Sequence, residues 1–132
     1  MPLNPIVASA VIFGTEGDTK DKVLLIRLNK ETSAGVWVPP GGKVETGEQA
    51  RDCAIRETYE ELGIKIEIDG IYGLYEKTYG DEIWTFILYK AHVVDGTPKS
   101  QEPGKVVEVK WVPEEEFKEH LQETTENLCL CK

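Results

Sequence analysis

The sequence has little of what marks membrane proteins, disulfide-stabilised proteins or proteins that bind nucleic acids. Its 132 residues include three cysteines, two histidines and one methionine, and 15 basic residues face 24 acidic ones. An odd number of cysteines does not make a disulfide framework, and no apolar run is long enough to span a membrane. We therefore expect a cytoplasmic protein in a reducing environment, without a signal peptide.

The excess of acidic residues narrows the choice of partners. A formal net charge of −9 repels duplex nucleic acid and anionic membrane surfaces, so we expect neither as a partner. It also repels a nucleotide, unless bound metal ions reverse the local field. The length suits one domain, which we expect to span 1–132, with its core at about 5–121 and a loose tail at 122–132.

Apolar patterns and turn residues predict an α/β fold with a mixed sheet. Strands at 6–13 and 22–28 should form a hairpin, because a polar turn containing glycine joins them. Two helices are predicted: Thr46 caps the first, which ends at Gly63, and a proline starts the second at 113–123. Strands apolar on both faces imply a sheet covered on both sides, hence an α/β/α sandwich. Further strands are predicted at 36–38, 64–68, 71–78, 82–94 and 106–112.

Negative charge is concentrated in the first predicted helix. On a helical wheel, Glu57 and Glu61 share one arc with small apolar residues, and Glu60 lies at the edge of that arc. Partly buried carboxylates one helical turn apart repel each other and are costly without compensation. Hard cations with oxygen ligands, Mg²⁺ or Mn²⁺, would remove this cost. A solvated acidic face, the usual explanation of glutamate runs, would place the acids opposite the apolar arc.

Two glycines, Gly41 and Gly42, come shortly before this helix. Glycine allows the backbone to approach a ligand closely, and a backbone carbonyl here could join the ligands of a metal ion. Taken alone, the pair favours an ordinary turn between a strand and a helix. The carboxylates that follow are what favours a ligand-binding role.

The spacing of these residues resembles the Nudix box, the signature of the Nudix hydrolases. The stretch from Gly42 to Ile64 reads GKVETGEQARDCAIRETYEELGI. The residues that match the box are Gly42, Glu48, Arg56, Glu57, Glu60, Glu61 and Gly63. Thr58 stands where the motif usually has an aliphatic residue. The resemblance implies a Nudix-type α/β/α sandwich and a divalent-metal enzyme that hydrolyses a nucleoside diphosphate linked to a further group X.

The resemblance also implies roles for single residues in catalysis and metal binding. Glu57 and Glu61 correspond to the principal ligands of Mg²⁺ or Mn²⁺. Glu60 and the carbonyl of Gly41 correspond to further ligands. The residues implied to orient the carboxylates during catalysis are Arg56 and Glu48.

The catalytic base varies within the family, and two glutamates compete for the role here. Glu57 is one candidate. Glu102 is the other, because related enzymes often carry a metal-binding or base glutamate in the corresponding loop. A plain surface acid explains Glu102 about equally well. Asp81 and Glu82 are weaker rivals.

Five residues are candidates for contacts with the substrate. Arg27 could contact phosphate, and the backbone at Gly42 can approach phosphates closely. Trp37, Trp84 and Phe86 could stack on a base, because flat aromatic rings grip any nucleobase. An exposed structural arginine and ordinary core aromatics are the alternatives.

The compact length and the sequence Trp-Val-Pro-Pro-Gly-Gly before the box resemble the small nucleoside triphosphate pyrophosphohydrolases of the MutT type. A nucleoside triphosphate is therefore the expected substrate, with ADP-ribose or a dinucleoside polyphosphate as the runner-up. A non-catalytic nucleotide-binding module on the same fold is the alternative function. Such modules usually lose box carboxylates, and this chain keeps them all. An exposed sheet edge could pair two copies into a homodimer.

Overall fold

The computed structural model of the protein describes residues 4–29 and 36–131. Within these ranges no helix has the length and apolar character needed to cross a membrane. The elements follow one another as β1 Ile6–Ile12, η1 Gly17–Thr19, β2 Lys22–Leu28, β3 Trp37–Val38, β4 Gly41–Lys43, α1 Ala50–Leu62, β5 Lys65–Tyr79, β6 Glu82–Asp95, β7 Val106–Pro113, α2 Glu114–Thr124 and β8 Glu126–Leu130.

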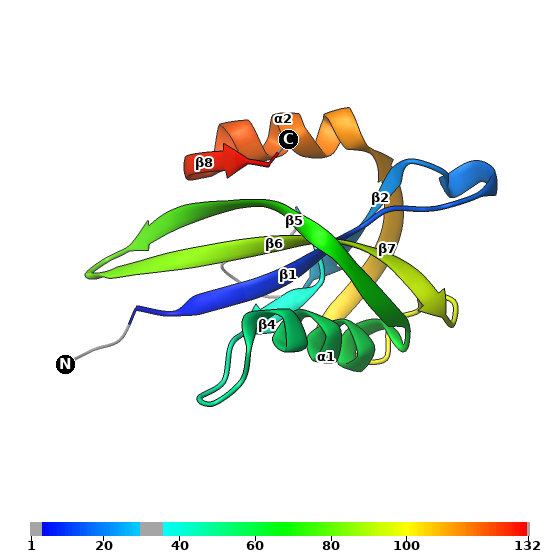
Figure 1. The fold of residues 1–132 in the computed structure, drawn as a ribbon, viewed down its shortest axis with the longest axis horizontal. Coiled ribbons are helices and arrows are strands. Elements are labelled where there is room, and N and C mark those ends of the chain that lie inside the picture. Colours follow the sequence, from blue (N-terminus) through cyan, green and yellow to red (C-terminus); the bar gives the residue numbers. More distant parts are fainter. Residues whose placement is uncertain (1–3, 30–35, 132) are drawn as a thin grey trace.

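The strands form two sheets (Figure 1). The larger sheet has five strands in the order β4-β1-β6-β5-β8, and the smaller has three in the order β3-β2-β7. Strands β1 and β6 run parallel and the other pairs of the larger sheet run antiparallel, so this sheet is mixed, as predicted. The long hairpin of β5 and β6 projects beyond both helices at the left of Figure 1.

The two helices cover opposite sides of the sheets, α1 below and α2 above in Figure 1. Side chains of β1 pack alternately against the α1 side and the α2 side of the sheet, because successive residues of a strand point in opposite directions. Ala10 and Ile12 pack in one core with Leu62 of α1. Val11 packs in a second core with Phe117 of α2. The predicted α/β/α sandwich around a mixed sheet is confirmed.

Helix α1 starts later than the sequence predicts. Thr46 is not its cap: the N-cap position belongs to Gln49, and the helix runs from Ala50 to Leu62. Gly47 has a φ of 82°, a left-handed backbone conformation that an α-helix cannot contain, so the preceding segment forms a turn. The end is as predicted, since Gly63 is the C-cap with a φ of 69°.

The predicted hairpin of the first two strands is wrong. Strand β1 lies in the larger sheet, whereas β2 lies between β3 and β7 in the smaller one. An isolated bridge between Phe13 and Val23 links their ends. Consecutive strands are neighbours in most proteins, which is the basis of the prediction, but both strands here find partners from distant parts of the sequence.

Gly41 and Gly42 do not form the turn that the pair alone would favour: with Lys43 they form the edge strand β4. Gly42 pairs with Ala8 of β1, and Gly41 pairs with Ser9. A side chain at Gly41 would collide with the backbone of Ala8 and Ser9, because its Cβ would lie 2.4 Å from the Ala8 carbonyl oxygen. The glycines therefore permit this close pairing, and the pairing fixes β4 beside α1.

The predicted loose tail is also wrong. Glu126–Leu130 forms β8, which pairs with β5 and makes an edge of the larger sheet. Leu128 and Leu130 pack against the core under α2, and the N–H of Cys131 donates to the Tyr72 carbonyl at 2.9 Å. Two alternating leucines are too short a signal to separate a strand from a tail. Lys132 lies outside the described residues.

Thr58 offers a test of how this core is packed. Its side chain is fully buried in α1, and its hydroxyl has no hydrogen-bond partner among the described residues. We expect Thr58→Val to raise the free energy of unfolding by roughly 1 kcal/mol, because it removes an unsatisfied buried hydroxyl at constant shape. Urea unfolding measures this. The matched control is Thr125→Val, whose hydroxyl donates to the Leu121 carbonyl at 2.6 Å, and which should lower stability.

Candidate active site

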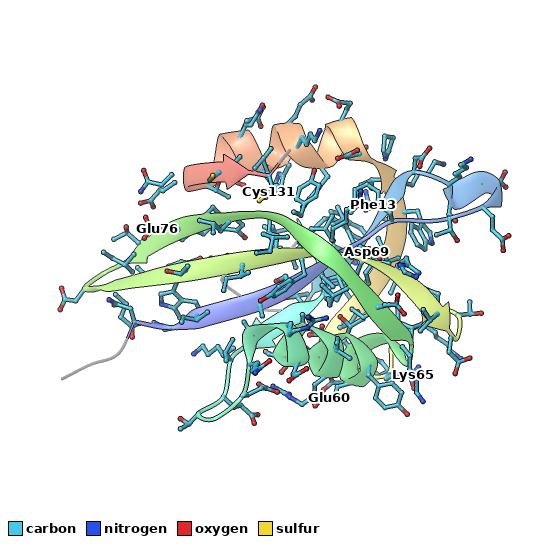
Figure 2. All side chains as sticks on the ribbon, viewed as in Figure 1. Phe13, Glu60, Lys65, Asp69, Glu76 and Cys131 are labelled. Carbon is cyan, nitrogen blue, oxygen red and sulfur yellow. The ribbon has the colours of Figure 1, made fainter. Side chains whose placement is uncertain are left out.

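The three glutamates of α1 differ sharply in exposure. The exposed fraction of the side chain is 1% for Glu61, 15% for Glu57 and 47% for Glu60. Glu60 lies on the side of the helix that faces away from the sheet (Figure 2). The low exposure of Glu57 and Glu61 agrees with the inward arc that the helical wheel predicts, and it contradicts a solvated acidic face. Glu60 lies further outward than the edge of the arc at which the wheel places it.

Strand β4 brings backbone against the two inward glutamates. The N–H of Gly41 donates to Oε1 of Glu61 at 3.0 Å. A Cβ on Gly42 would lie 2.4 Å from the carboxyl carbon of Glu57, so a side chain there would displace this carboxylate. The thiol of Cys53 donates to the Gly42 carbonyl at 3.4 Å, and burial raises its pKa to about 12. Helix and strand are thus joined where the carboxylates lie.

Arg56 of α1 contacts four acidic residues, two in its own helix and two in the segment before it. Its guanidinium donates to Glu48 at 2.7 Å and to Glu57 and Glu60 at 3.0 Å each. Glu45 lies 3.6 Å away. The hydrogen bond from Arg56 lowers the pKa of Glu48 to about 2. Arg56 thus links Glu48 to Glu57 and Glu60, and the orienting role that the resemblance implies for Arg56 and Glu48 stays a prediction.

The loop 96–105, between β6 and β7, reaches the carboxylates from the other side. The N–H of Gln101 donates to the backbone carbonyl of Glu61 at 2.8 Å, which fastens the loop to the end of α1. The ammonium of Lys105 lies 3.0 Å from Oε2 of Glu61. Burial raises the pKa of Glu61 to about 7, although the nearby charge of Lys105 acts to lower it. Glu102 belongs to this loop, and its side chain is exposed.

Trp84 and Phe86 lie in one row of aromatic rings on β5 and β6. Their ring centroids are 6.4 Å apart, and Phe86 stacks on Tyr75 at 4.6 Å. The ammonium of Lys43 lies 4.6 Å from the centroid of the Trp84 ring. Because Lys43 follows Gly42 directly in β4, this row begins beside the strand that contacts the glutamates.

Arg27 and Trp37 have partners within the smaller sheet. The guanidinium of Arg27 donates to Glu108 of β7 at 2.6 and 3.1 Å. The ammonium of Lys110 lies 4.2 Å from the centroid of the Trp37 ring. These cross-strand contacts account for both side chains without a substrate, and their substrate contacts stay predictions.

Two lysines of this region were not singled out by their sequence context. Lys43 follows Gly42 within the stretch from Gly42 to Ile64, so its position there was a usable signal. Lys105 had none, because only the folding of its loop onto α1 brings it to Glu61. The rivals for the base, Asp81 and Glu82, lie at the tip of the β5–β6 hairpin.

Glu67, Asp69 and His92 form a second group of possible metal ligands, with ligand atoms within 4.8 Å of one another. His92 and Asp69 are hydrogen-bonded at 2.8 Å, and this bond raises the pKa of His92. A cavity of about 640 Å³ adjoins them, and Phe13 is among its lining residues. Neither the group nor the cavity includes a residue of the box. We therefore place the candidate site at α1 and β4, where the box residues meet.

An α/β/α sandwich whose first helix presents paired glutamates to a glycine strand defines the class of protein. The NUDIX domain family model matches residues 3–128. The chain therefore belongs to the Nudix family.

Individual relatives and structures agree with this assignment. The uncharacterized Nudix hydrolase YvcI of Bacillus subtilis is 40% identical over 95 residues, which cover 67% of this chain and 58% of that protein. A Mycobacterium tuberculosis protein provisionally named 8-oxo-dGTP diphosphatase 2 is 30% identical over 121 residues, covering 82% and 79%. The crystal structure of a MutT NUDIX hydrolase from Burkholderia pseudomallei has a TM-score of 0.74 at 28% identity and covers 84% of each chain.

The relatives differ in length and in named substrate. This chain spans 58% of the Bacillus subtilis protein and 28% of a nudix hydrolase from Caenorhabditis elegans. Other relatives are named as an m7GpppN-mRNA hydrolase in Xenopus laevis and a diphosphoinositol polyphosphate phosphohydrolase in Mus musculus. Membership in the family therefore leaves the substrate of this chain open.

The Arg56–Glu48 contact should be visible in acid unfolding. The pKa of Glu48 is lowered to about 2 in the folded protein from an ordinary value of 4.5, so the unfolded chain binds more protons between these values. The stabilisation is complete above pH 4.5 and is lost as the pH falls toward 2. We expect Glu48→Gln to flatten this part of the curve of urea midpoint against pH. Glu119→Gln, on the exposed surface of α2, should leave the curve as in the wild type.

Proposed function

We propose that this chain is a divalent-metal-dependent hydrolase that cleaves the pyrophosphate linkage of a nucleoside diphosphate-X substrate, with a nucleoside triphosphate as the first candidate. The main support is that Glu57 and Glu61 meet Gly41 and Gly42 from a separate strand. Residues 1–132 are taken as one domain, because the family match spans 3–128.

The donor groups at this place suit Mg²⁺ or Mn²⁺. Carboxylate oxygens of Glu57 and Glu61 are hard ligands, and Gly41 lies beside Glu61. Glu60, on the outer side of α1, and the Gly41 carbonyl are retained as further candidate ligands. Glycine at position 42 leaves room beside the Glu57 carboxylate that a Cβ would fill. When bound, the metal polarises the phosphoryl oxygens and lowers the pKa of a bound water.

The protein itself contributes orientation and a proton acceptor. Arg56 donates a hydrogen bond to Glu57 at 3.0 Å, which orients this carboxylate. Glu102 is exposed on a loop that is fastened to the end of α1, the helix that carries Glu57 and Glu61. Glu57 and Glu102 are therefore both retained as candidates for the general base.

The aromatic row supports a nucleotide as the substrate. Trp84 and Phe86 offer flat surfaces for a nucleobase, and the ammonium of Lys43, the residue after Gly42, lies 4.6 Å from the centroid of the Trp84 ring. The name of the Mycobacterium tuberculosis relative refers to a nucleoside triphosphate, 8-oxo-dGTP. ADP-ribose and dinucleoside polyphosphates are the runner-up substrates. A cytoplasmic location and a homodimer paired through a sheet edge stay predictions.

A metal-dependent hydrolysis screen tests the activity. With Mg²⁺ or Mn²⁺ the protein should hydrolyse one of three classes: nucleoside triphosphates, ADP-ribose or dinucleoside polyphosphates. Glu57→Gln and Glu61→Gln should each lower kcat on the order of 10²-fold or more and weaken the metal-induced rise in Tm, while circular dichroism stays unchanged. Glu119→Gln is the control for removing one negative charge. Near-normal turnover in both box variants would refute the proposal.

The binding position of the substrate's nucleobase can be tested at Trp84. We expect Trp84→Leu to raise KM for a nucleotide on the order of tenfold, because the stacking contact between the Trp84 ring and the nucleobase is lost. The kcat and the metal-induced rise in Tm should stay unchanged. Trp37→Leu is the comparison, since this ring lies under Lys110 in the smaller sheet. A larger rise in KM for Trp37→Leu than for Trp84→Leu would indicate that the nucleobase binds at the smaller sheet.

A further inference from the structure

A lysine from outside the Nudix box lies among its carboxylates. The ammonium of Lys105 is 3.0 Å from Oε2 of Glu61, and the other oxygen of Glu61 accepts the Gly41 N–H at 3.0 Å. Burial alone would lower the pKa of Lys105, but the attraction of Glu61 raises it overall, and Glu57 and Glu102 contribute to the increase. Lys105 thus carries a positive charge close to the place proposed for a divalent cation.

The backbone around Lys105 fixes where its ammonium lies. The N–H of Gln101 donates to the backbone carbonyl of Glu61 at 2.8 Å, which attaches the loop to α1. The N–H of Lys105 donates to the Glu102 carbonyl, also at 2.8 Å, and forms a turn within the loop. The Lys105 side chain is 35% exposed, so its long stem has a route to solvent if the ammonium is displaced.

We propose that Lys105 is a built-in counter-cation of the metal site, which holds Glu61 in place without metal and competes with the divalent ion for the carboxylates. This role rests on the proposed function, because it takes Glu57 and Glu61 as metal ligands. It assigns to a residue outside the box the regulation of how tightly the box binds metal.

The electrostatics give two expected consequences. Glu61 is 1% exposed, so a charged carboxylate here without a cation is costly, and removal of Lys105 should destabilise the metal-free protein. The same removal takes away a like charge close to an incoming dication, so the metal should bind more tightly. A purely structural salt bridge would produce the first effect without the second.

The experiment titrates Mn²⁺ alone into the wild type, Lys105→Met and Lys105→Gln at pH 8, and follows the unbound ion by electron paramagnetic resonance. We expect Kd for Mn²⁺ to fall about tenfold in both variants, as expected for loss of one nearby positive charge. Lys105→Gln keeps a hydrogen-bond donor for Glu61 and guards against loss of folding in Lys105→Met. Melting curves should show a lower Tm without metal and a larger rise with Mn²⁺ than in the wild type.

Two further variants serve as controls. Lys105→Arg keeps the charge and should bind Mn²⁺ as the wild type does. Lys99→Met removes an exposed lysine from the same loop and should leave Kd unchanged. Tighter binding in Lys99→Met equal to that in Lys105→Met would reduce the effect to net charge and overturn the specific role of Lys105.

The outcomes separate this role from the proposed function. Unchanged or weaker Mn²⁺ binding in Lys105→Met and Lys105→Gln, while the wild type binds Mn²⁺ and hydrolyses nucleotides, would overturn the role of Lys105 alone. A raised KM for the nucleotide with unchanged Mn²⁺ binding would also overturn it and would make Lys105 a substrate contact. No Mn²⁺ binding by the wild type would overturn the proposed function and this role together.

Discussion

Carboxylates held against an apolar core are the constraint on which this structure depends. Glu61 is almost completely buried, directly before Leu62, which packs in the core beside α1. A buried carboxylate persists only where hydrogen bonds and cations compensate for lost hydration. Gly41 supplies a backbone N–H, and Lys105 supplies a positive charge. Strand β4 and the loop 96–105 therefore lie where their polar groups compensate for the buried charge of Glu61.

The two inward glutamates are compensated differently. Glu57 is held by Arg56 from its own helix, at 15% exposure, and touches the glycine strand. Glu61 is held by Lys105, which comes from a distant loop and is partly open to solvent. An arginine fork fixes an orientation, whereas a lysine is a mobile point charge. Glu57 thus has a partner within its own helix, whereas the partner of Glu61 comes from the loop 96–105.

Much of the site could be predicted from sequence because it is helical and local. The wheel places Glu57 and Glu61 correctly, since helical periodicity alone decides which side each residue faces. Glu60 was expected at the edge of the inward arc and lies outside it. The resemblance gave Arg56 and Glu48 an orienting role, but their direct contact is a finding of the structure. Lys105 could not be found this way, because its position depends on how a loop folds onto α1. Arg27 shows the reverse case: its type fits phosphate, but Glu108 on the neighbouring strand is its partner.

Pairing of strands was less predictable than their existence. The mixed α/β/α architecture follows from strands that are apolar on both faces, but apolar pattern does not say which strand lies beside which. The first two strands therefore looked like a hairpin and belong to different sheets. Strand β8 was missed because only pairing with β5 gives its short alternation a partner.

The parallel pairing of β1 with β6 has a consequence for the order of assembly. Ile6 lies opposite Thr85, so the larger sheet cannot close until most of the chain has been synthesised. Helix α1 and β4 are close in sequence and can meet much earlier. Lys105 follows β6 and is synthesised after all of these segments. A nascent chain that ends before β6 therefore carries the acidic helix without its lysine. If Lys105 has the role proposed above, divalent ions would reach the carboxylates of such a chain without competition from it.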